Sequence, residues 1–109
     1  MKLQEIVTKL EIKGLTVVPD RDVTGVYISD MVSDVIANAK AGNLLVTLQV
    51  HTNALAAANL VDICGIVVAQ GKQPADDVLK MAERHQIGIF ATELNRWQLA
   101  TRLYEAGVR

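Results

Sequence analysis

Apolar and polar residues follow two different spacing patterns along the second half of the chain. Residues 44–50, 65–69 and 87–91 are short, nearly continuous apolar runs, a pattern typical of strands that are buried on both faces. Helical spacing of apolar residues follows each run and predicts helices over 52–62 and 74–85, and a last helix over about 95–106. This alternation predicts parallel β-α-β crossovers with helices on both faces of the sheet.

The first 43 residues carry a less regular pattern. Apolar residues at helical spacing predict a helix over 3–10. Two segments rich in β-branched residues, 15–18 and 23–28, flank the turn sequence "PDRD" and predict two strands that are close enough to form a hairpin. Ser29 or Asp30 can cap a helix that continues to about residue 40. The fold class predicted is a three-layer α/β/α domain with a central, mostly parallel sheet and a possible antiparallel N-terminal strand.

Several residues indicate where the helices begin and which side faces inward. Asn95 followed by Gln98 resembles a capping box, Thr52 or Asn53 can cap the Ala-rich helix, and Pro74 suits the first helical position. Two helices are predicted to pack an apolar face against the core. The inward side chains are Val32, Val35, Ile36 and Ala39 in the helix that ends near residue 40, and Leu99, Ala100, Leu103 and Tyr104 in the last helix.

Composition narrows the class of protein. A chain of 109 residues with a formal net charge of −1 is expected to form one domain, and it has no basic field for nucleic acid or an acidic membrane surface. Its single cysteine excludes an internal disulfide and favours a reducing compartment. Neither a signal-peptide core nor a membrane-spanning run is found in the sequence, so we expect a cytoplasmic location.

Uncharged polar residues follow the three buried strands. In parallel sheets ligands bind beyond the carboxyl ends of the strands, so a small polar ligand or the backbone of a partner protein is expected there. We predict no catalytic group and no cofactor. The residues predicted to form the binding site are Gln49, His51, Thr52, Asn53, Gln70, Gly71, Lys72 and Thr92.

The turn at Gly71-Lys72 resembles a phosphate-binding loop but lacks its features. A dinucleotide or P-loop motif needs several glycines so that free N–H groups can approach the phosphates, and only one glycine lies in this turn. Pro74 removes one helix N–H, while Asp76 and Asp77 satisfy the helix dipole themselves and repel phosphate. Helix capping is therefore favoured over nucleotide binding in this turn.

Three single residues could carry chemistry. His51 could act as a base or bind an anion, but no acidic neighbour orients it, which favours a structural role. Cys64 is expected to be a buried, unreactive thiol. Arg21 could grip an anion, although Asp20 and Asp22 on either side favour local pairing at the surface. The histidines and cysteine lack the paired spacing of a zinc site.

The Ala-rich helix has two possible uses. Methyl groups at Ala54, Ala57 and Ala58 allow another backbone to approach closely. They could pack tightly on their own sheet, or they could form the self-complementary face of a homodimer. The sequence leaves both alternatives open.

Three segments, "GNLLVTLQVHTNALAAANL", "GIVVAQGKQPADDVLKMAERHQIGIFAT" and "WQLATRLYEAG", resemble the DRTGG domain and, more distantly, the N-terminal domain of HPr kinase/phosphorylase. The resemblance spans nearly the whole chain. Because that family accompanies CBS pairs in regulated pyrophosphatases and occurs in phosphotransacetylases, it implies a regulatory or dimerising α/β module. The family's Asp-Arg falls on Val50 and His51, and its Thr-Gly-Gly falls on Ala69, Gln70 and Gly71, so only the last glycine is kept.

The leading hypothesis is a non-catalytic, stand-alone DRTGG-like domain that forms a homodimer and binds a small polar ligand or a regulatory protein partner. One alternative is a sensor of adenine nucleotides or another anion. Another is a small transferase or hydrolase that uses His51 with Lys72 or Arg21. A serine kinase is not supported, because the sequence has no P-loop.

Overall fold

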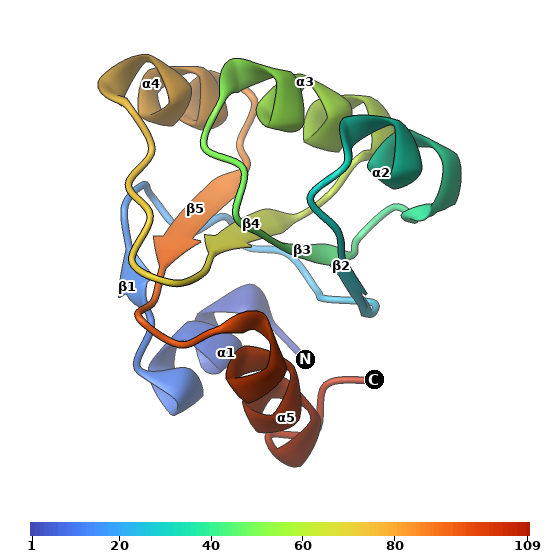
Figure 1. Ribbon diagram of the computed structural model, residues 1–109. Helices are drawn as coiled ribbons and strands as arrows, with labels where there is room; N and C mark the ends of the chain where they lie inside the picture. Colours follow the sequence, from blue (N-terminus) through green and yellow to red (C-terminus); the bar gives the residue numbers. More distant parts are fainter.

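A five-stranded sheet lies between two layers of helices in the computed structural model, which describes residues 1–109 (Figure 1). Helices α2, α3 and α4 cover one face, and α1 and α5 cover the other. The three-layer α/β/α architecture predicted from the sequence is therefore confirmed. The elements are α1 (Leu3–Leu10), β1 (Lys13–Gly14), β2 (Val26–Ile28), α2 (Val32–Asn38), β3 (Leu44–Thr47), α3 (Thr52–Val61), β4 (Gly65–Val68), α4 (Asp76–Arg84), β5 (Gly88–Ala91) and α5 (Arg96–Glu105).

The strands are arranged in the order β1-β5-β4-β3-β2. Strands β2 to β5 are parallel to one another, with Leu44 opposite Val26 on one side and Gly65 on the other. Strand β1 runs antiparallel to β5, with Lys13 opposite Ala91. The sheet is mixed, as the sequence allowed, but the predicted hairpin is wrong because β1 and β2 lie at opposite edges.

The predicted strand over 15–18 is also wrong, for a reason that lies in its hydrogen bonds. The N–H of Leu15 still donates to the carbonyl of Ile89 at 2.8 Å. The N–H of Ile89, however, donates to the hydroxyl of Thr16 at 3.0 Å instead of to a main-chain carbonyl. The side chain of Thr16 thereby ends the ladder, and Val17 projects into solvent.

Each face of the sheet has its own hydrophobic core. Phe90, Leu44 and Val46 point toward α1 and α5, while Leu45 and Ile66 point toward α2, α3 and α4. Two predicted inward positions are wrong: Ile36 is 46% exposed and Tyr104 is 63% exposed. Both residues lie at the margin of the apolar stripe that the helical spacing defines. They are exposed because each helix packs only one face against the sheet.

The helix ends agree with the sequence in part. Asn95 and Gln98 form the predicted capping box, in which each side-chain oxygen accepts from the other residue's N–H, at 2.8 and 2.9 Å. Neither Thr52 nor Asn53 caps α3, since the residue before the helix is His51. Helix α4 begins at Asp76, so Pro74 precedes the helix instead of opening it. None of the five helices is long and apolar enough to cross a membrane.

Candidate functional site

The carboxyl ends of β3, β4 and β5 lie at one edge of the sheet, because Thr47, Val68 and Ala91 are aligned in register. The predicted binding residues lie in the loops that follow these strands and, for Thr52 and Asn53, in the first turn of α3. These residues do not form one cluster. They divide between the β3 end and the β4–β5 corner, and the two places have different chemistry.

A saturated polar network occupies the ends of β2 and β3. Oδ1 of Asp30 accepts from the hydroxyl of Thr47 at 3.1 Å and from the N–H of Leu48 at 2.7 Å. Oδ2 of Asp30 pairs with Arg96 at the start of α5. The side chain of Gln49 donates to the main-chain carbonyl of Asp30 at 2.8 Å. Gln49 is therefore committed to this network and is not free for a ligand.

Asp30 and Arg96 were missed as network residues by the sequence reasoning. Asp30 was expected to cap a helix, but its carboxylate instead contacts the end of β3, and the helix that follows it has Met31 as its cap residue. Arg96 is 66 positions away along the chain. No spacing in the sequence predicts this pair. Asp30 precedes α2 and Arg96 begins α5, and these two helices lie on opposite faces of the sheet (Figure 1).

His51 stands at the start of α3 with its side chain exposed to solvent. The imidazole makes no hydrogen bond or ion pair, and the neighbouring side chains of Thr52 and Asn53 make none either. Beneath His51 is a void of only about 10 Å³ with a mostly apolar lining. That volume holds roughly one water molecule, so a small-molecule ligand cannot enter there.

The main-chain N–H groups of the turn at Gln70 and Gly71 already donate hydrogen bonds within the protein. The N–H of Gln70 donates to the carbonyl of Leu94 at 2.9 Å, and the N–H of Gly71 donates to the carbonyl of Thr92 at 3.0 Å. These bonds join the loop after β4 to the loop after β5. They leave the turn without the free N–H groups that a phosphate cradle requires. The side chains of Gln70 and Lys72 lie outside this contact, Gln70 at φ 60° and both exposed.

A hollow of about 460 Å³, here called the β5 hollow, lies at the corner formed by the ends of β4 and β5, the end of α1, and β1. Figure 1 shows these segments meeting at one corner of the molecule. Gly71 and Thr92 from the predicted site line it. Its full lining is Leu10, Glu11, Lys13, Gly71, Gln73, Ala91, Thr92, Glu93, Leu94 and Arg102.

The β5 hollow is lined by charged side chains of both signs that form no ion pair within the protein. Lys13 and Arg102 supply the cations, and Glu11 and Glu93 supply the carboxylates. None of the ion pairs in the structure involves these four side chains. A ligand with an anionic group and several hydroxyl or amino donors could therefore bind here without breaking an internal contact.

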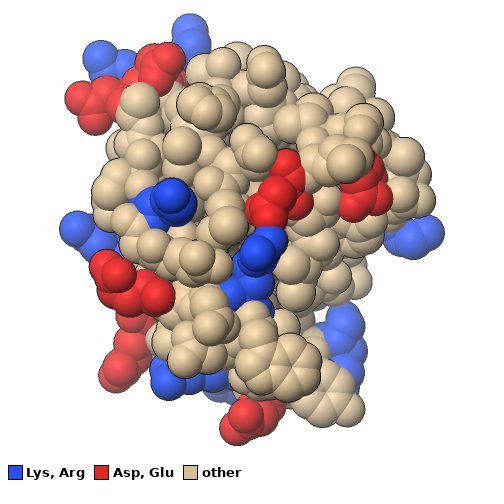
Figure 2. All heavy atoms as spheres, viewed as in Figure 1, with Lys and Arg blue, Asp and Glu red and all other residues tan.

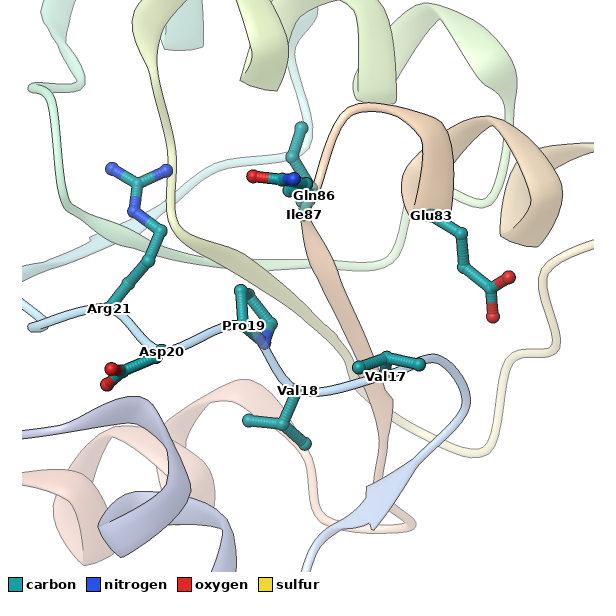
Figure 3. A pocket seen from close by; sticks show the side chains of 8 residues that line it. All are labelled: Val17, Val18, Pro19, Asp20, Arg21, Glu83, Gln86 and Ile87. Atoms are coloured by element: carbon teal, nitrogen blue, oxygen red, sulfur yellow. The ribbon is translucent and has the colours of Figure 1, made fainter.

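A larger hollow of about 650 Å³, here called the Pro19 hollow, lies at the opposite edge of the sheet, where Ile87 precedes β5. Figure 3 shows Arg21 and Glu83 at its two ends, with Pro19 and Gln86 between them. Its lining is mainly apolar, and its one cation is Arg21.

Arg21 is not free to bind an anion. Its guanidinium donates to Oδ1 of Asp62 at 3.0 Å, to the carbonyl of Asp62 at 3.3 Å and to the carbonyl of Ile63 at 3.4 Å. It therefore satisfies the C-terminal end of α3. The expected local pairing of Arg21 with Asp20 and Asp22 is wrong, because those two carboxylates pair with Lys2.

Cys64 and the small helix residues are buried. Burial raises the pKa of the Cys64 thiol from 9.0 to about 11, which makes the thiol a poor nucleophile. Ala54, Ala57 and Ala58 are 7%, 3% and 0% exposed within the single chain, where α3 packs on the sheet and between α2 and α4. Their side chains are not available to a second chain, so tight internal packing is the alternative that the structure shows.

Charged residues are dispersed over the surface. Figure 2 shows basic and acidic atoms interspersed across one face, without a basic patch. No group of three or more His, Cys, Asp or Glu side chains is placed to hold a metal ion. The β5 hollow collects charges of both signs around a concavity, and so does an adjoining hollow of about 530 Å³ that shares Glu11 and Arg102 with it.

Comparison with known proteins establishes the family. The model of the DRTGG domain matches residues 5–106. No curated protein matches the chain. Among solved structures, the CBS and DRTGG domains of the regulatory region of Clostridium perfringens pyrophosphatase, complexed with the activator diadenosine tetraphosphate, superpose with a TM-score of 0.76 at 13% identity. The match covers 95% of this chain but 46% of that one, so this chain spans about half its length. The chain belongs to the DRTGG domain family.

Proposed function

We propose that this chain is a non-catalytic regulatory domain that binds a nucleoside phosphate in the β5 hollow. The observation that carries the proposal is the set of unpaired charges around that hollow: Lys13 and Arg102 beside Glu11 and Glu93. The structural neighbour supports the class of ligand, since it is a regulatory region complexed with a dinucleotide activator.

The two kinds of charge suit different parts of such a ligand. Arg102 and Lys13 can bind phosphate oxygens, because charge-assisted hydrogen bonds to phosphate are among the stronger polar contacts. Carboxylates such as Glu11 and Glu93 can accept hydrogen bonds from ribose hydroxyls or from a base amino group. Leu10 and Leu94 add apolar surface for the base. Binding by side chains also accounts for a glycine turn whose N–H groups are used internally.

The enzyme alternative receives less support from the geometry. Arg21 lies at the amino ends of the strands and is held by Asp62, whereas His51 immediately precedes α3 at their carboxyl ends. His51 has no orienting carboxylate, and a histidine base is normally oriented by one. A transferase or hydrolase built on His51 with Arg21 would have to act across the full length of the sheet.

Binding can be measured by calorimetric titration and by thermal unfolding with ATP, AMP, diadenosine tetraphosphate and inorganic phosphate. A ligand at a hundredfold excess over its dissociation constant stabilises the folded state by about 2.7 kcal/mol, which should raise the midpoint by about 10 °C for a domain of this size. Lys13→Ala and Arg102→Ala should each weaken binding about tenfold or more, the cost of one charge-assisted contact.

Lys80→Ala is the matched control, because Lys80 is an exposed lysine of α4 outside the β5 hollow. If Lys80→Ala weakens binding as much as Lys13→Ala does, the attraction is non-specific. If a nucleotide binds equally well to the wild type and to the Lys13→Ala and Arg102→Ala variants, the site lies elsewhere. If no nucleotide binds, the nucleotide proposal fails and a protein partner becomes the favoured ligand.

A further inference from the structure

The only tryptophan of the chain, Trp97, lies on the surface in the first turn of α5. It is 77% exposed and belongs to neither of the two hydrophobic cores. Tryptophan is highly buried on average, so packing within a single chain does not explain this position. The indole presents a large, flat and mostly apolar surface with one N–H donor, which suits it to binding a ligand.

A second exposed aromatic residue of the same helix already has a partner on its ring. Tyr104 is 63% exposed, but the guanidinium of Arg109 lies 3.7 Å from the centre of its ring. No lysine or arginine side chain covers the ring of Trp97 in this way. The face of the indole is therefore free, whereas one face of Tyr104 is occupied within the protein.

Trp97 lines the hollow of about 530 Å³ that adjoins the β5 hollow, here called the α1–α5 groove. Figure 1 shows α1 and α5 packed side by side on one face of the sheet. Leu10, Glu11 and Arg102 line both the α1–α5 groove and the β5 hollow. Because they share these residues, the two hollows are adjoining parts of one concave surface.

Polar side chains of the α1–α5 groove can still donate hydrogen bonds. Oε1 of Gln98 accepts from the N–H of Asn95 at 2.9 Å, which fixes the amide and leaves its NH2 group without a partner. Lys9 also lines the groove and forms no ion pair. A nucleic-acid base has hydrogen-bond acceptors along its edge and a flat face that stacks on aromatic side chains. The groove therefore offers both kinds of contact that a base can make.

We infer that the base of a bound nucleotide stacks on Trp97 in the α1–α5 groove. The inference rests on the proposed function, in which Arg102 and Lys13 bind the phosphates. Trp97 and Arg102 lie in the same helix, about 7.5 Å apart along its axis, a separation that the ribose of a nucleotide can bridge. Leu10 lines both hollows, so the apolar surface offered to the base continues from the β5 hollow to the indole.

Because Trp97 is the only tryptophan, its fluorescence in the whole chain reports on this contact directly. Titration with AMP should quench the emission to a plateau, since a stacked base quenches an indole. Ribose 5-phosphate carries the phosphate without the base, so it should leave the emission unchanged. It should also bind about tenfold or more weakly than AMP in calorimetric titration, the loss expected for one stacked base. Free tryptophan mixed with AMP corrects for quenching by collision.

Substitutions of Trp97 separate stacking from a structural role. Trp97→Ala should weaken AMP binding about tenfold or more, whereas Trp97→Phe keeps an aromatic face and should lose much less. Neither substitution should change the binding of ribose 5-phosphate, which a disturbed fold would weaken as well. Tyr104→Ala is the matched control, because Tyr104 is an exposed aromatic residue of α5 that lines neither hollow. It should bind AMP as tightly as the wild type.

The outcomes distinguish this inference from the proposed function. If Lys13→Ala weakens AMP binding but the emission stays constant and Trp97→Ala binds like the wild type, the β5 hollow is the site and the contact with Trp97 is refuted. Equal losses in Trp97→Ala and Tyr104→Ala would also overturn the inference. If AMP quenches the emission and only Trp97→Ala loses affinity, the base contact is upheld and the proposed phosphate site is wrong. If no nucleotide binds, both fail.

Discussion

Removing the carboxylate of Asp30 tests whether the network at the ends of β2 and β3 stabilises the fold. In Asp30→Ala, the hydroxyl of Thr47, a residue only 1% exposed, and the N–H of Leu48 both lose their acceptor. An unsatisfied buried donor costs about 1–3 kcal/mol. Allowing for some relaxation of the loop, we expect the free energy of unfolding to fall by about 2–4 kcal/mol.

Two further substitutions separate the hydrogen bonds from the ion pair. Asp30→Asn keeps an oxygen acceptor for Thr47 and Leu48 but removes the charge that pairs with Arg96. Because the two side chains of that ion pair are 31% and 41% exposed, the loss should be about 1 kcal/mol or less. Arg96→Ala should cost a similarly small amount, since both substitutions break the same pair.

Urea denaturation at pH 7, followed by circular dichroism, measures these differences. Asp30→Ala should lower the urea midpoint by about 1–2 M, whereas Glu105→Ala, a substitution at an exposed residue of α5 without an ion pair, should stay within about 0.5 kcal/mol of the wild type. The reasoning is refuted if Asp30→Ala is as stable as the control. It is also refuted if Asp30→Asn is as damaging as Asp30→Ala, because the charge would then matter more than the hydrogen bonds.

Three other predictions concern residues outside this network. The Cys64 thiol, with its pKa raised from 9.0 to about 11, stabilises the fold fully below pH 9 and loses this contribution as pH rises through 11; the stability advantage of the wild type over Cys64→Ala should shrink over that window, and a constant difference would contradict the assignment. Asn95→Ala should cost about 1 kcal/mol by removing the cap of α5, while Asn95→Asp, which keeps the acceptor, should cost much less. Gly71→Ala should destabilise by about 1–2 kcal/mol, because Gly71 has φ 71° and a Cβ would lie 2.6 Å from Oε2 of Glu93; a Gly71→Ala variant of unchanged midpoint would refute this.

The elements from β3 onward could be predicted because their signals are local. Strands β3, β4 and β5 are apolar in sequence since both of their faces are buried, and a strand followed by a helix and a parallel strand has few possible arrangements. The cap at Asn95 was equally predictable, because both partners of the capping box lie within one turn.

The N-terminal strands could not be placed in the same way. Lys13 and Gly14 pair with Ala91 and Phe90 near the other end of the chain, and two residues leave no periodic signal. Leu15 to Val18 has a higher β propensity than β1, yet a hydroxyl from Thr16 ends the ladder there. The tertiary contact with β5 decided the outcome, since strand propensity depends on the neighbour that a segment meets.

The candidate site was predictable only as an edge of the sheet. The sequence located polar residues after β3, β4 and β5, and Gly71 and Thr92 do line the β5 hollow. The sequence did not show that the side chain of Gln49 is hydrogen-bonded to the main-chain carbonyl of Asp30. It also did not show that Lys13 of β1 and Arg102 of α5 line the same hollow. Those residues come from segments that are brought together only when α1 and α5 pack side by side on the sheet.

The sequence by itself therefore determined the layers, the parallel strands and the edge at which polar loops collect, because each of these follows from periodicity within about a dozen residues. Only the tertiary structure decided the order of the outer strands, the partners of Asp30 and Arg21, and the charges that surround the β5 hollow. The physical reason is that the position of an edge strand and the pairing of charged side chains depend on which distant segments come together, and no local pattern encodes that contact.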